Sequence, residues 1–251
     1  MKVTVIIPAR YGSSRLEGKP LADIVGKPMI QHVYERASEA SGVDDVLVAT
    51  DDERIFSTVE GFGGKAVMTS TEHQTGTDRL AEVAASLDSD IIVNVQGDEP
   101  MMSPKMIEEA VAPLLKNRTI KMGTLKTVLR NKEDLHDSAV AKIVVDKDDF
   151  ALYFSRSPIP FLREDGEAAY DAVYYKHIGL YVYDREFLLH YAKMPQTPLE
   201  KAERLEQLRA LENGYRIKAV TTQEESFGVD TQEGLEKVRA LITKRMENKN
   251  G

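Results

Sequence analysis

The chain has 251 residues, which is enough for one large domain or two small ones. Its formal net charge of −8 argues against a partner coated in phosphate, such as a nucleic acid, although a local cluster of cations could still hold a small anion. The chain has no cysteine and no run of about 18 apolar residues, which excludes disulfides, thiolate metal sites and a Cys nucleophile and predicts a cytoplasmic protein with no membrane partner.

The first half of the chain alternates short apolar runs with helical patterns. The apolar runs predict buried strands at residues 3–7, 46–49 and 91–95, with a shorter run at 66–68. Apolar residues at helical spacing predict helices between these runs, at residues 28–40, 54–60, 80–87 and 106–114. Strands that are apolar on both faces and separated by helices are typical of an α/β fold with a parallel sheet covered on both sides.

The carboxyl ends of the predicted strands are where a ligand is expected, because ligands of parallel sheets gather at that edge. The loops after Ile7, Ala49 and Val95 should therefore lie on one rim, and each carries polar residues. This rim is where the sequence predicts a binding site.

The second half of the chain is less regular. The pattern predicts strands at residues 122–129, 142–145, 178–183 and 216–222, and helices at residues 199–211 and 232–245. Residues 150–175 contain two prolines and a glycine and are predicted to be mainly irregular. Without an internal repeat or low-complexity linker, the simplest organisation is one domain over residues 1–251, with an excursion at 130–190 and a frayed tail at 248–251.

The loop after the first predicted strand, residues 8–20, combines glycines with three cationic side chains, Arg10, Arg15 and Lys19. Glycines allow backbone N–H groups to turn toward an anion. An Arg side chain offers a fork for phosphate oxygens, and a Lys side chain offers a compact point charge. On the ligand edge of a parallel sheet, this combination favours a nucleotide phosphate site.

The same loop is not a P-loop. Five residues separate Gly12 from Gly18, and Pro20 stands where a Ser or Thr would contact magnesium. It is not a GxGxxG dinucleotide loop either. A solvated connection with ordinary surface charges is the alternative interpretation.

An ordered set of motifs extends over the whole chain. The motifs lie at residues 6–10, 18–21, 48–51, 75–80, 94–100, 151–156, 176–181, 205–209 and 228–231. Together they resemble the sugar nucleotidyltransferases and, more narrowly, the CMP-Kdo synthetase (3-deoxy-manno-octulosonate cytidylyltransferase) family, which activates an acidic sugar. The first loop alone is shared by many nucleotidyltransferases, but the ordered set is specific. Residues 136–141 depart from the family, which usually has an Asn-containing segment there.

The resemblance implies a single three-layer, Rossmann-like nucleotidyltransferase domain with a mainly parallel central sheet, and a homodimer. Apolar and aromatic residues between Phe150 and Tyr183, within the 130–190 excursion, could form the dimer interface, with core packing as the alternative. It implies transfer of a cytidylyl group from CTP to 3-deoxy-D-manno-octulosonate (Kdo), giving CMP-Kdo and pyrophosphate for lipopolysaccharide synthesis, with Mg²⁺ as cofactor. The sugar's anomeric hydroxyl is expected to attack the α-phosphorus directly, because no His and Ser arrangement suggests a covalent nucleophile. The alternatives are an 8-amino analogue of Kdo or a sialic-type acid as acceptor, and a non-catalytic nucleotide-sugar sensor.

Four residues carry the chemistry that the resemblance implies at the phosphates. Arg10 and Lys19 match phosphate ligands and are expected on the β- and γ-phosphates, with plain surface charges as the alternative. Asp98 and Asp230 match carboxylates that hold Mg²⁺, a hard ion that takes oxygen ligands. Asp230 could instead be the N-cap of the last predicted helix.

The remaining candidates concern the acidic sugar. Its carboxylate needs a cation or several donors, and the matched motifs offer Arg79, Arg156 and His177. Further polar residues of the motifs could contact sugar hydroxyls, namely Gln96, Tyr181, Glu206 and Gln207. A hydrogen-bonded sheet residue is the alternative for His177. The polar face of the 199–211 helix is the alternative for Glu206 and Gln207.

Overall fold

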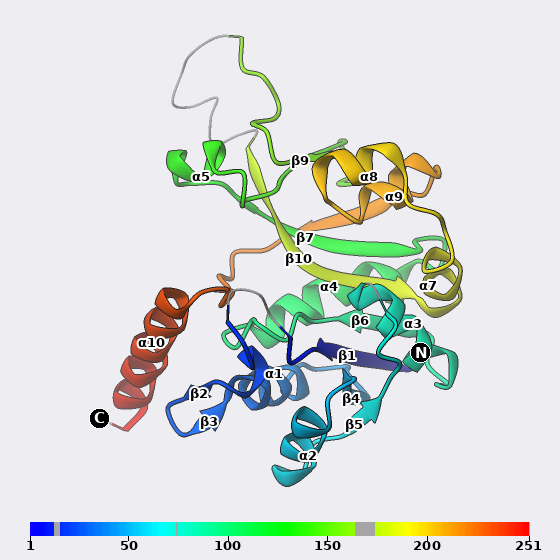
Figure 1. Ribbon diagram of the computed structural model, residues 1–251. Coiled ribbons are helices and arrows are strands. Elements are labelled where there is room, and N and C mark those ends of the chain that lie inside the picture. The colour runs from blue at the N-terminus through cyan, green and yellow to red at the C-terminus, as the bar shows by residue number, and fades with distance from the viewer. Residues whose placement is uncertain (13–15, 74, 164–173, 251) are drawn as a thin grey trace. The chain divides into compact units, whose positions relative to one another are not determined.

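The computed structural model describes residues 1–12, 16–73, 75–163 and 174–250, with side chains to residue 247 (Figure 1). The chain forms two compact units. The first unit is Met1–Glu108 with Glu224–Gly251, and the second unit is Glu109–Gln223. The second unit contains the whole predicted excursion at 130–190. Arg15, one of the three predicted loop cations, lies outside the described residues.

The first unit is built on a parallel sheet. Its strands run in the order β6-β1-β4-β5 and comprise Ile91–Asn94, Val3–Ala9, Asp45–Thr50 and Ala66–Met68 in that order. In β1, Ile6 pairs with Leu47 of β4 on one side and with Asn94 of β6 on the other. This arrangement confirms the predicted α/β class with a mainly parallel sheet.

The helices of the first unit connect these strands as the apolar periodicity predicts. They are α1 (Met29–Ser38), α2 (Glu53–Gly61) and α3 (Gly76–Ala85), while α4 (Pro104–Lys116) leads into the second unit. Local capping fixes where they begin. The Asp52 side chain accepts from the Arg54 N–H at the start of α2, and Thr75 and Asp78 form a capping box at the start of α3.

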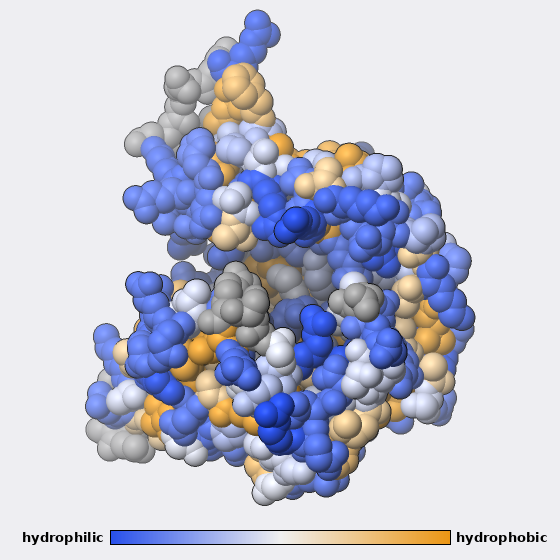
Figure 2. Space-filling view, viewed as in Figure 1, coloured by the Kyte–Doolittle hydropathy of each residue, from blue (hydrophilic) through white to orange (hydrophobic). Residues whose placement is uncertain are grey.

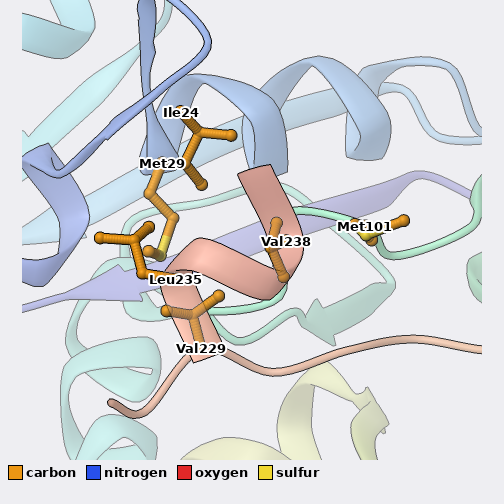
Figure 3. Close-up of a cluster of buried hydrophobic side chains, with 6 residues drawn as sticks. All are labelled: Ile24, Met29, Met101, Val229, Leu235 and Val238. Atoms are coloured by element: carbon orange, nitrogen blue, oxygen red, sulfur yellow. The ribbon is translucent and has the colours of Figure 1, made fainter. Parts of the chain in front are cut away.

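Within the first unit, a buried apolar cluster joins the C-terminal segment to the N-terminal part of the chain (Figure 3). Val229, Leu235 and Val238 pack against Met29 at the start of α1 and against Ile24 and Met101. Ile24 belongs to the hairpin of β2 (Asp23–Ile24) and β3 (Lys27–Pro28), and Leu235 and Val238 belong to α10 (Gln232–Asn250). Burial of these side chains brings residue 230, which follows Val229, back to the residues of the N-terminal half.

The second unit contains a mixed sheet in which neighbouring strands follow the order β11-β7-β10-β8-β9. In chain order these strands are β7 (Met122–Val128), β8 (Lys142–Val145), β9 (Ala151–Ser155), β10 (Tyr175–Asp184) and β11 (Ile217–Thr221). Strand β11 is parallel to β7, and the other pairs are antiparallel. The helices are α5 (Lys132–His136), α7 (Arg185–Tyr191), α8 (Pro198–Glu203) and α9 (Leu208–Glu212).

The structure differs from two predictions for this unit. The start of the segment predicted to be irregular, residues 150–175, forms strand β9, because Ala151 and Phe154 are buried and the prolines come only afterwards. The predicted single helix at 199–211 is two short helices. Arg204 has φ 53° and ψ 46°, a left-handed conformation that an α-helix cannot contain, and it ends α8.

The face of the molecule in Figure 2 is predominantly hydrophilic, with smaller apolar areas between the charged residues. This agrees with the charged fraction of 29% in the sequence. None of the helices in the described ranges combines the length and the apolar composition that crossing a bilayer requires.

Candidate active site

A pocket of about 340 Å³ opens at the carboxyl end of the parallel sheet in the first unit. It is lined by residues of the loop after β1, the start of α3, the loop after β6 and the segment before α10: Pro8, Ala9, Arg10, Gly12, Lys19, Pro20, Gly76, Arg79, Gln96, Gly97, Asp98 and Asp230. The two loops that follow β1 and β6 therefore border one pocket, as the strand order predicts.

Gly18 adopts a backbone conformation that a residue with a side chain would disfavour. Gly18 has φ 64°, and a Cβ there would also meet the Tyr11 ring at 3.1 Å. Its N–H donates to the Tyr11 carbonyl oxygen at 3.0 Å, which closes the loop before the short 3₁₀ helix Lys19–Leu21. A residue with a side chain would be strained here, so Gly18 is needed to place Lys19 at the pocket.

The loop after β6 approaches the end of β1 closely. A Cβ at Gly97 would lie 2.9 Å from the Pro8 carbonyl oxygen, a distance that real Cβ atoms essentially never show. Gly97 therefore allows the chain to pass the end of β1 before it reaches Asp98. The Val229 N–H donates to the Asp98 carbonyl oxygen at 2.8 Å, which joins this loop to the segment that carries Asp230.

Lys19 lies between the two candidate metal carboxylates. Its Nζ donates to Asp98 Oδ2 at 2.6 Å and to Asp230 Oδ1 at 3.1 Å. Burial by itself lowers the pKa of Lys19, but the Asp98 and Asp230 carboxylates outweigh that effect and raise the pKa above its ordinary value. The ammonium is therefore charged and serves as the counter-ion of both carboxylates.

The alternative role of Asp230, the N-cap of the last helix, is filled by its neighbour. The Thr231 hydroxyl oxygen accepts from the Gly234 N–H at 3.1 Å, and the Thr231 carbonyl oxygen accepts from Leu235 at 3.0 Å. These two bonds make Thr231 the N-cap of α10. The Asp230 carboxylate points instead to the ammonium of Lys19.

The residues of this pocket fit a hard divalent cation. A cation, the Lys19 ammonium, already lies within bonding distance of both Asp98 and Asp230, and carboxylate oxygens are the ligands that Mg²⁺ prefers. Within the described ranges no three His, Cys, Asp or Glu side chains gather as a metal cage would need. A metal here would therefore take its other ligands from substrate phosphates and water, as Mg²⁺ commonly does.

Arg79 and Gln96 complete the predicted residues of the first unit, and both line the pocket. Arg79 belongs to α3 and is 1% exposed; its guanidinium donates to Asp51 Oδ2 at 2.6 Å and to the Thr69 hydroxyl. Its charge is thus already balanced by Asp51, which makes it a weaker candidate for a sugar carboxylate. Gln96 is half-buried beside Asn94, with 3.5 Å between their amide groups.

The remaining predicted residues belong to the second unit. Two of them, His177 and Tyr181, lie on β10 on either side of a register shift between Ile178 and Tyr181. Their ring centroids are 5.4 Å apart, so the two side chains lie side by side.

His177 is held as a neutral imidazole. It is 8% exposed, its Nε2 lies 3.0 Å from the Thr124 hydroxyl oxygen, and its ring packs edge-on against Phe154. Burial lowers the pKa of His177 to about 3. At neutral pH the ring can give a sugar carboxylate a hydrogen bond but no positive charge. The hydrogen-bonded sheet residue, the alternative interpretation, describes these contacts.

Arg156, the third carboxylate candidate, is committed to the backbone. Its guanidinium donates to the carbonyl oxygens of Glu203 at 2.7 Å, Ser138 at 2.8 Å and Arg204 at 3.3 Å. The Arg156 N–H also donates to the Glu203 carboxylate at 2.9 Å. These bonds hold the end of α8 next to the end of β9.

Glu206 and Gln207 lie on the turn between α8 and α9 and not on a helix face, so the helical alternative was wrong for both. Glu206 is half-buried, while Gln207 is 2% exposed. Within the described part of the chain, Gln207 Nε2 has no hydrogen-bond partner. A buried amide that donates no bond is costly, so its donor is available to a ligand.

Comparison with known proteins shows the family to which this chain belongs. A model of the family described as "Cytidylyltransferase" matches residues 4–219. The 3-deoxy-manno-octulosonate cytidylyltransferase of Geotalea uraniireducens is 59% identical over 97% of this chain and 100% of the relative. The chain belongs to the cytidylyltransferase family. The protein of the same description from Geobacter sulfurreducens is 57% identical to this cytidylyltransferase, over 95% of this chain and 98% of its own length.

Solved structures agree with this family and with its fold. CMP:2-keto-3-deoxy-manno-octonic acid synthetase complexed with CTP matches this cytidylyltransferase with a TM-score of 0.92 and 47% identity, over 98% of this chain and 100% of that chain. A cytidylyltransferase from Leptospira borgpetersenii, 17% identical, has a TM-score of 0.66 over 97% and 87% of the two chains and shares the fold.

Sequence reasoning missed the residues of this cytidylyltransferase that hold the turn at 204–207. The Tyr191 hydroxyl donates to the Glu206 carbonyl oxygen at 2.6 Å, and Arg209 forms a buried fork with Glu200 at 2.8 and 2.5 Å. A buried ion pair in a predicted helix was a possible signal, but Glu200 and Arg209 are nine residues apart, which is not a helical spacing.

Proposed function

We propose that this cytidylyltransferase transfers the cytidylyl group of CTP to Kdo and releases pyrophosphate. The single observation that carries the proposal is the cluster at the nucleotide pocket, where Lys19 bridges Asp98 and Asp230. The names of its relatives and the CTP complex of its structural neighbour support the nucleotide and the acceptor. The product, CMP-Kdo, would serve lipopolysaccharide synthesis.

The loop after β1 is assigned to the triphosphate. Arg10 and Lys19 both line the pocket, and Arg10 is exposed there, so both can reach phosphate oxygens. We assign them to the β- and γ-phosphates, with N–H groups of the loop as further donors. Their charges would neutralise the pyrophosphate as it departs, which lowers the barrier to transfer.

The carboxylates Asp98 and Asp230 are assigned to Mg²⁺. When bound, the ion would offset the charge that develops on the α-phosphate. Lys19 would then exchange its carboxylate partners for phosphate oxygens, because the two carboxylates would no longer need its ammonium. This exchange leaves Lys19, Asp98 and Asp230 each with a partner of opposite charge, both with and without nucleotide.

In the transfer, the anomeric hydroxyl oxygen of Kdo forms a bond to the α-phosphorus while the bond to the β-phosphate oxygen breaks. The hydroxyl proton passes to water, and the bond pair leaves with pyrophosphate. We assign recognition of the sugar to the polar residues Gln96, His177, Tyr181, Glu206 and Gln207. Arg156, whose guanidinium is bonded to backbone carbonyl oxygens, is assigned to holding the end of α8. Arg79, which is paired with Asp51, is assigned to holding the pocket wall.

The assembly state is also a proposal. Two apolar residues of the second unit, Leu152 at 62% exposed and Phe161 at 89% exposed, lie within the predicted excursion and support a homodimer through that surface. Light scattering should give the mass of two chains, and a monomer for the Phe161→Ser, Leu152→Ser double variant. A cytoplasmic location is proposed because the nucleotide substrate is CTP.

Release of pyrophosphate tests the function. With CTP and Mg²⁺, release should require Kdo, should be absent with UTP or ATP in place of CTP, and should be weaker with the 8-amino analogue or a sialic-type acid. Faster release with the amino sugar would reassign the acceptor. No release with any acidic sugar would favour a nucleotide-sugar sensor.

A further inference from the structure

The turn at 204–207 in the second unit is an element that the fold builds at some cost. The chain leaves α8 through Arg204, a non-glycine residue in the left-handed conformation, which is unfavourable for a residue with a Cβ atom. It enters α9 only at Leu208. Such strain persists where the surrounding structure fixes the backbone.

Bonds from two side chains and one backbone N–H fix this turn. Arg156 donates to the carbonyl oxygens of Glu203 and Arg204 at its start. The Tyr191 hydroxyl donates to the carbonyl oxygen of Glu206 at 2.6 Å, in the middle of the turn. The same carbonyl accepts the backbone N–H of Arg209 at 3.0 Å.

A buried ion pair ties α8 to α9 below the turn. Arg209 Nε and one of its terminal nitrogens donate to both carboxylate oxygens of Glu200 at 2.8 and 2.5 Å, and the two side chains are 4% and 6% exposed. The Glu200 carboxylate also accepts from the Thr197 N–H at 3.2 Å, which closes the capping box of α8. Paired in this way, the buried charges are compensated.

These bonds hold the backbone around Glu206 and Gln207. Gln207 is 2% exposed, and its amide nitrogen has no partner within the described part of the chain. Its neighbour Glu206 has its carbonyl oxygen fixed by Tyr191. An unpaired buried donor on an over-determined turn is the arrangement expected of a preformed contact to a ligand.

We infer that Tyr191 is a positioning residue for the acceptor sugar: its hydroxyl fixes the backbone of Glu206 and thereby aims Glu206 and Gln207. The inference rests on the proposed function, in which these two residues contact the sugar. Tyr191 itself touches neither substrate in this account. It acts through the Glu206 carbonyl oxygen, 2.6 Å from its hydroxyl.

Tyr191 is well suited to this task. It ends α7, is 1% exposed, and its ring stacks on Tyr183 and Phe187 with centroid distances of 6.0 and 5.6 Å. Burial, with a smaller contribution from the Glu206 carboxylate, raises the pKa of Tyr191, so the hydroxyl keeps its proton and remains a donor. A phenylalanine would keep the ring stacking and remove only the donor.

The test is the Tyr191→Phe variant in the pyrophosphate assay, with KM measured separately for Kdo and CTP. The KM for Kdo should rise roughly three- to tenfold, the scale of one lost hydrogen bond, while the KM for CTP stays within about twofold of wild type. Tyr174→Phe is the matched control, because the Tyr174 hydroxyl also donates to a backbone carbonyl, that of Pro160 at 2.8 Å. It should lower Tm but leave both KM values unchanged.

The results distinguish a positioning role of Tyr191 from a structural one. If wild type turns over with Kdo and Tyr191→Phe lowers Tm without a change in either KM, Tyr191 has a merely structural role and the inference is overturned. An equal rise in both KM values also overturns it. If wild type releases no pyrophosphate with Kdo, the proposed function fails, and the inference fails with it.

Discussion

The pocket that we assign to the nucleotide, in the first unit, and the turn of the second unit hold their polar side chains in opposite ways. In the pocket, the Asp98 and Asp230 side chains are 31% and 53% exposed and share one counter-ion, Lys19. On the turn and the neighbouring strand, Gln207 and His177 are 2% and 8% exposed and are fixed by packing and backbone bonds. The first arrangement suits charges that change partners, and the second suits recognition by preset, neutral donors.

The largest effect is expected at the exchangeable charges. Asp98→Asn keeps the size of the side chain but removes the charge assigned to Mg²⁺, so turnover should fall by about 10²-fold or more, the scale of losing one preorganised electrostatic group. The measurement is pyrophosphate release at saturating CTP, Kdo and Mg²⁺.

A surface carboxylate provides the control for Asp98. Asp45→Asn removes a charge that pairs with Lys65 at 2.7 Å in the same unit, and this variant should keep the wild-type rate. A rate near wild type for Asp98→Asn at saturating Mg²⁺ would remove Asp98 from the mechanism.

Lys19→Met tests both roles proposed for the Lys19 ammonium, which are binding the phosphates of CTP and neutralising Asp98 and Asp230. The KM for CTP should rise about tenfold or more, because a charged hydrogen bond to phosphate is lost. Without CTP, the variant should bind Mn²⁺ several-fold more tightly than wild type, since no ammonium competes for Asp98 and Asp230. Spectroscopic titration of free Mn²⁺ measures this without turnover.

Lys27→Met removes an equal charge elsewhere in the first unit, from a pair with Glu35 at 2.7 Å, and should leave Mn²⁺ affinity as in wild type. Unchanged Mn²⁺ affinity and unchanged CTP affinity in Lys19→Met would contradict the shared site.

Gln207→Leu tests the preset donors of the second unit. The KM for Kdo should rise about tenfold, while the KM for CTP should stay unchanged. The free energy of unfolding should not decrease, because the variant removes a buried amide that makes no bond through Nε2. Steady-state kinetics and urea unfolding provide the two measurements. A loss of stability with an unchanged KM for Kdo would show a structural amide instead.

The last prediction concerns stability in acid and not activity. The folded pKa of His177, about 3, lies below its ordinary value of 6.5, so between these pH values the unfolded chain binds a proton that the folded chain does not. The free energy of unfolding should fall with decreasing pH in this window, by up to about 1.4 kcal/mol per pH unit from this residue. His177→Gln should show a shallower fall in denaturant titrations, and an identical slope would mean that His177 is not buried as a neutral ring.

The two regions also differ in how far the sequence predicts them. The apolar strands and the rule that ligands gather at their carboxyl ends were enough to bring the loops after β1 and β6 to one pocket, and Gly18 and Gly97 mark the backbone positions that allow it. Asp230 arrives from the other end of the chain, and only the family resemblance predicted it. Nothing in the sequence indicated that Lys19 would bridge both carboxylates, because that contact depends on how α10 packs.

The second unit was less predictable because its key features break local rules. Arg204 adopts a left-handed conformation without being glycine, so the helical periodicity of 199–211 gave no warning of the turn. Gly179, within the predicted strand at 178–183, was a signal for the register shift between Ile178 and Tyr181, since an isolated glycine in a strand often marks a bulge. The bonds of Tyr191 and Arg156 to backbone carbonyls leave no sequence signal at all.

The central claim, cytidylyl transfer to Kdo, is tested most directly by identifying the product. The protein should be incubated with CTP, Kdo and Mg²⁺, the product mass determined, and pyrophosphate quantified in the same reaction. The predicted result is CMP-Kdo with one pyrophosphate formed for each molecule of product. Consumption of CTP to CDP and phosphate, or pyrophosphate without a CMP-sugar, would contradict the account.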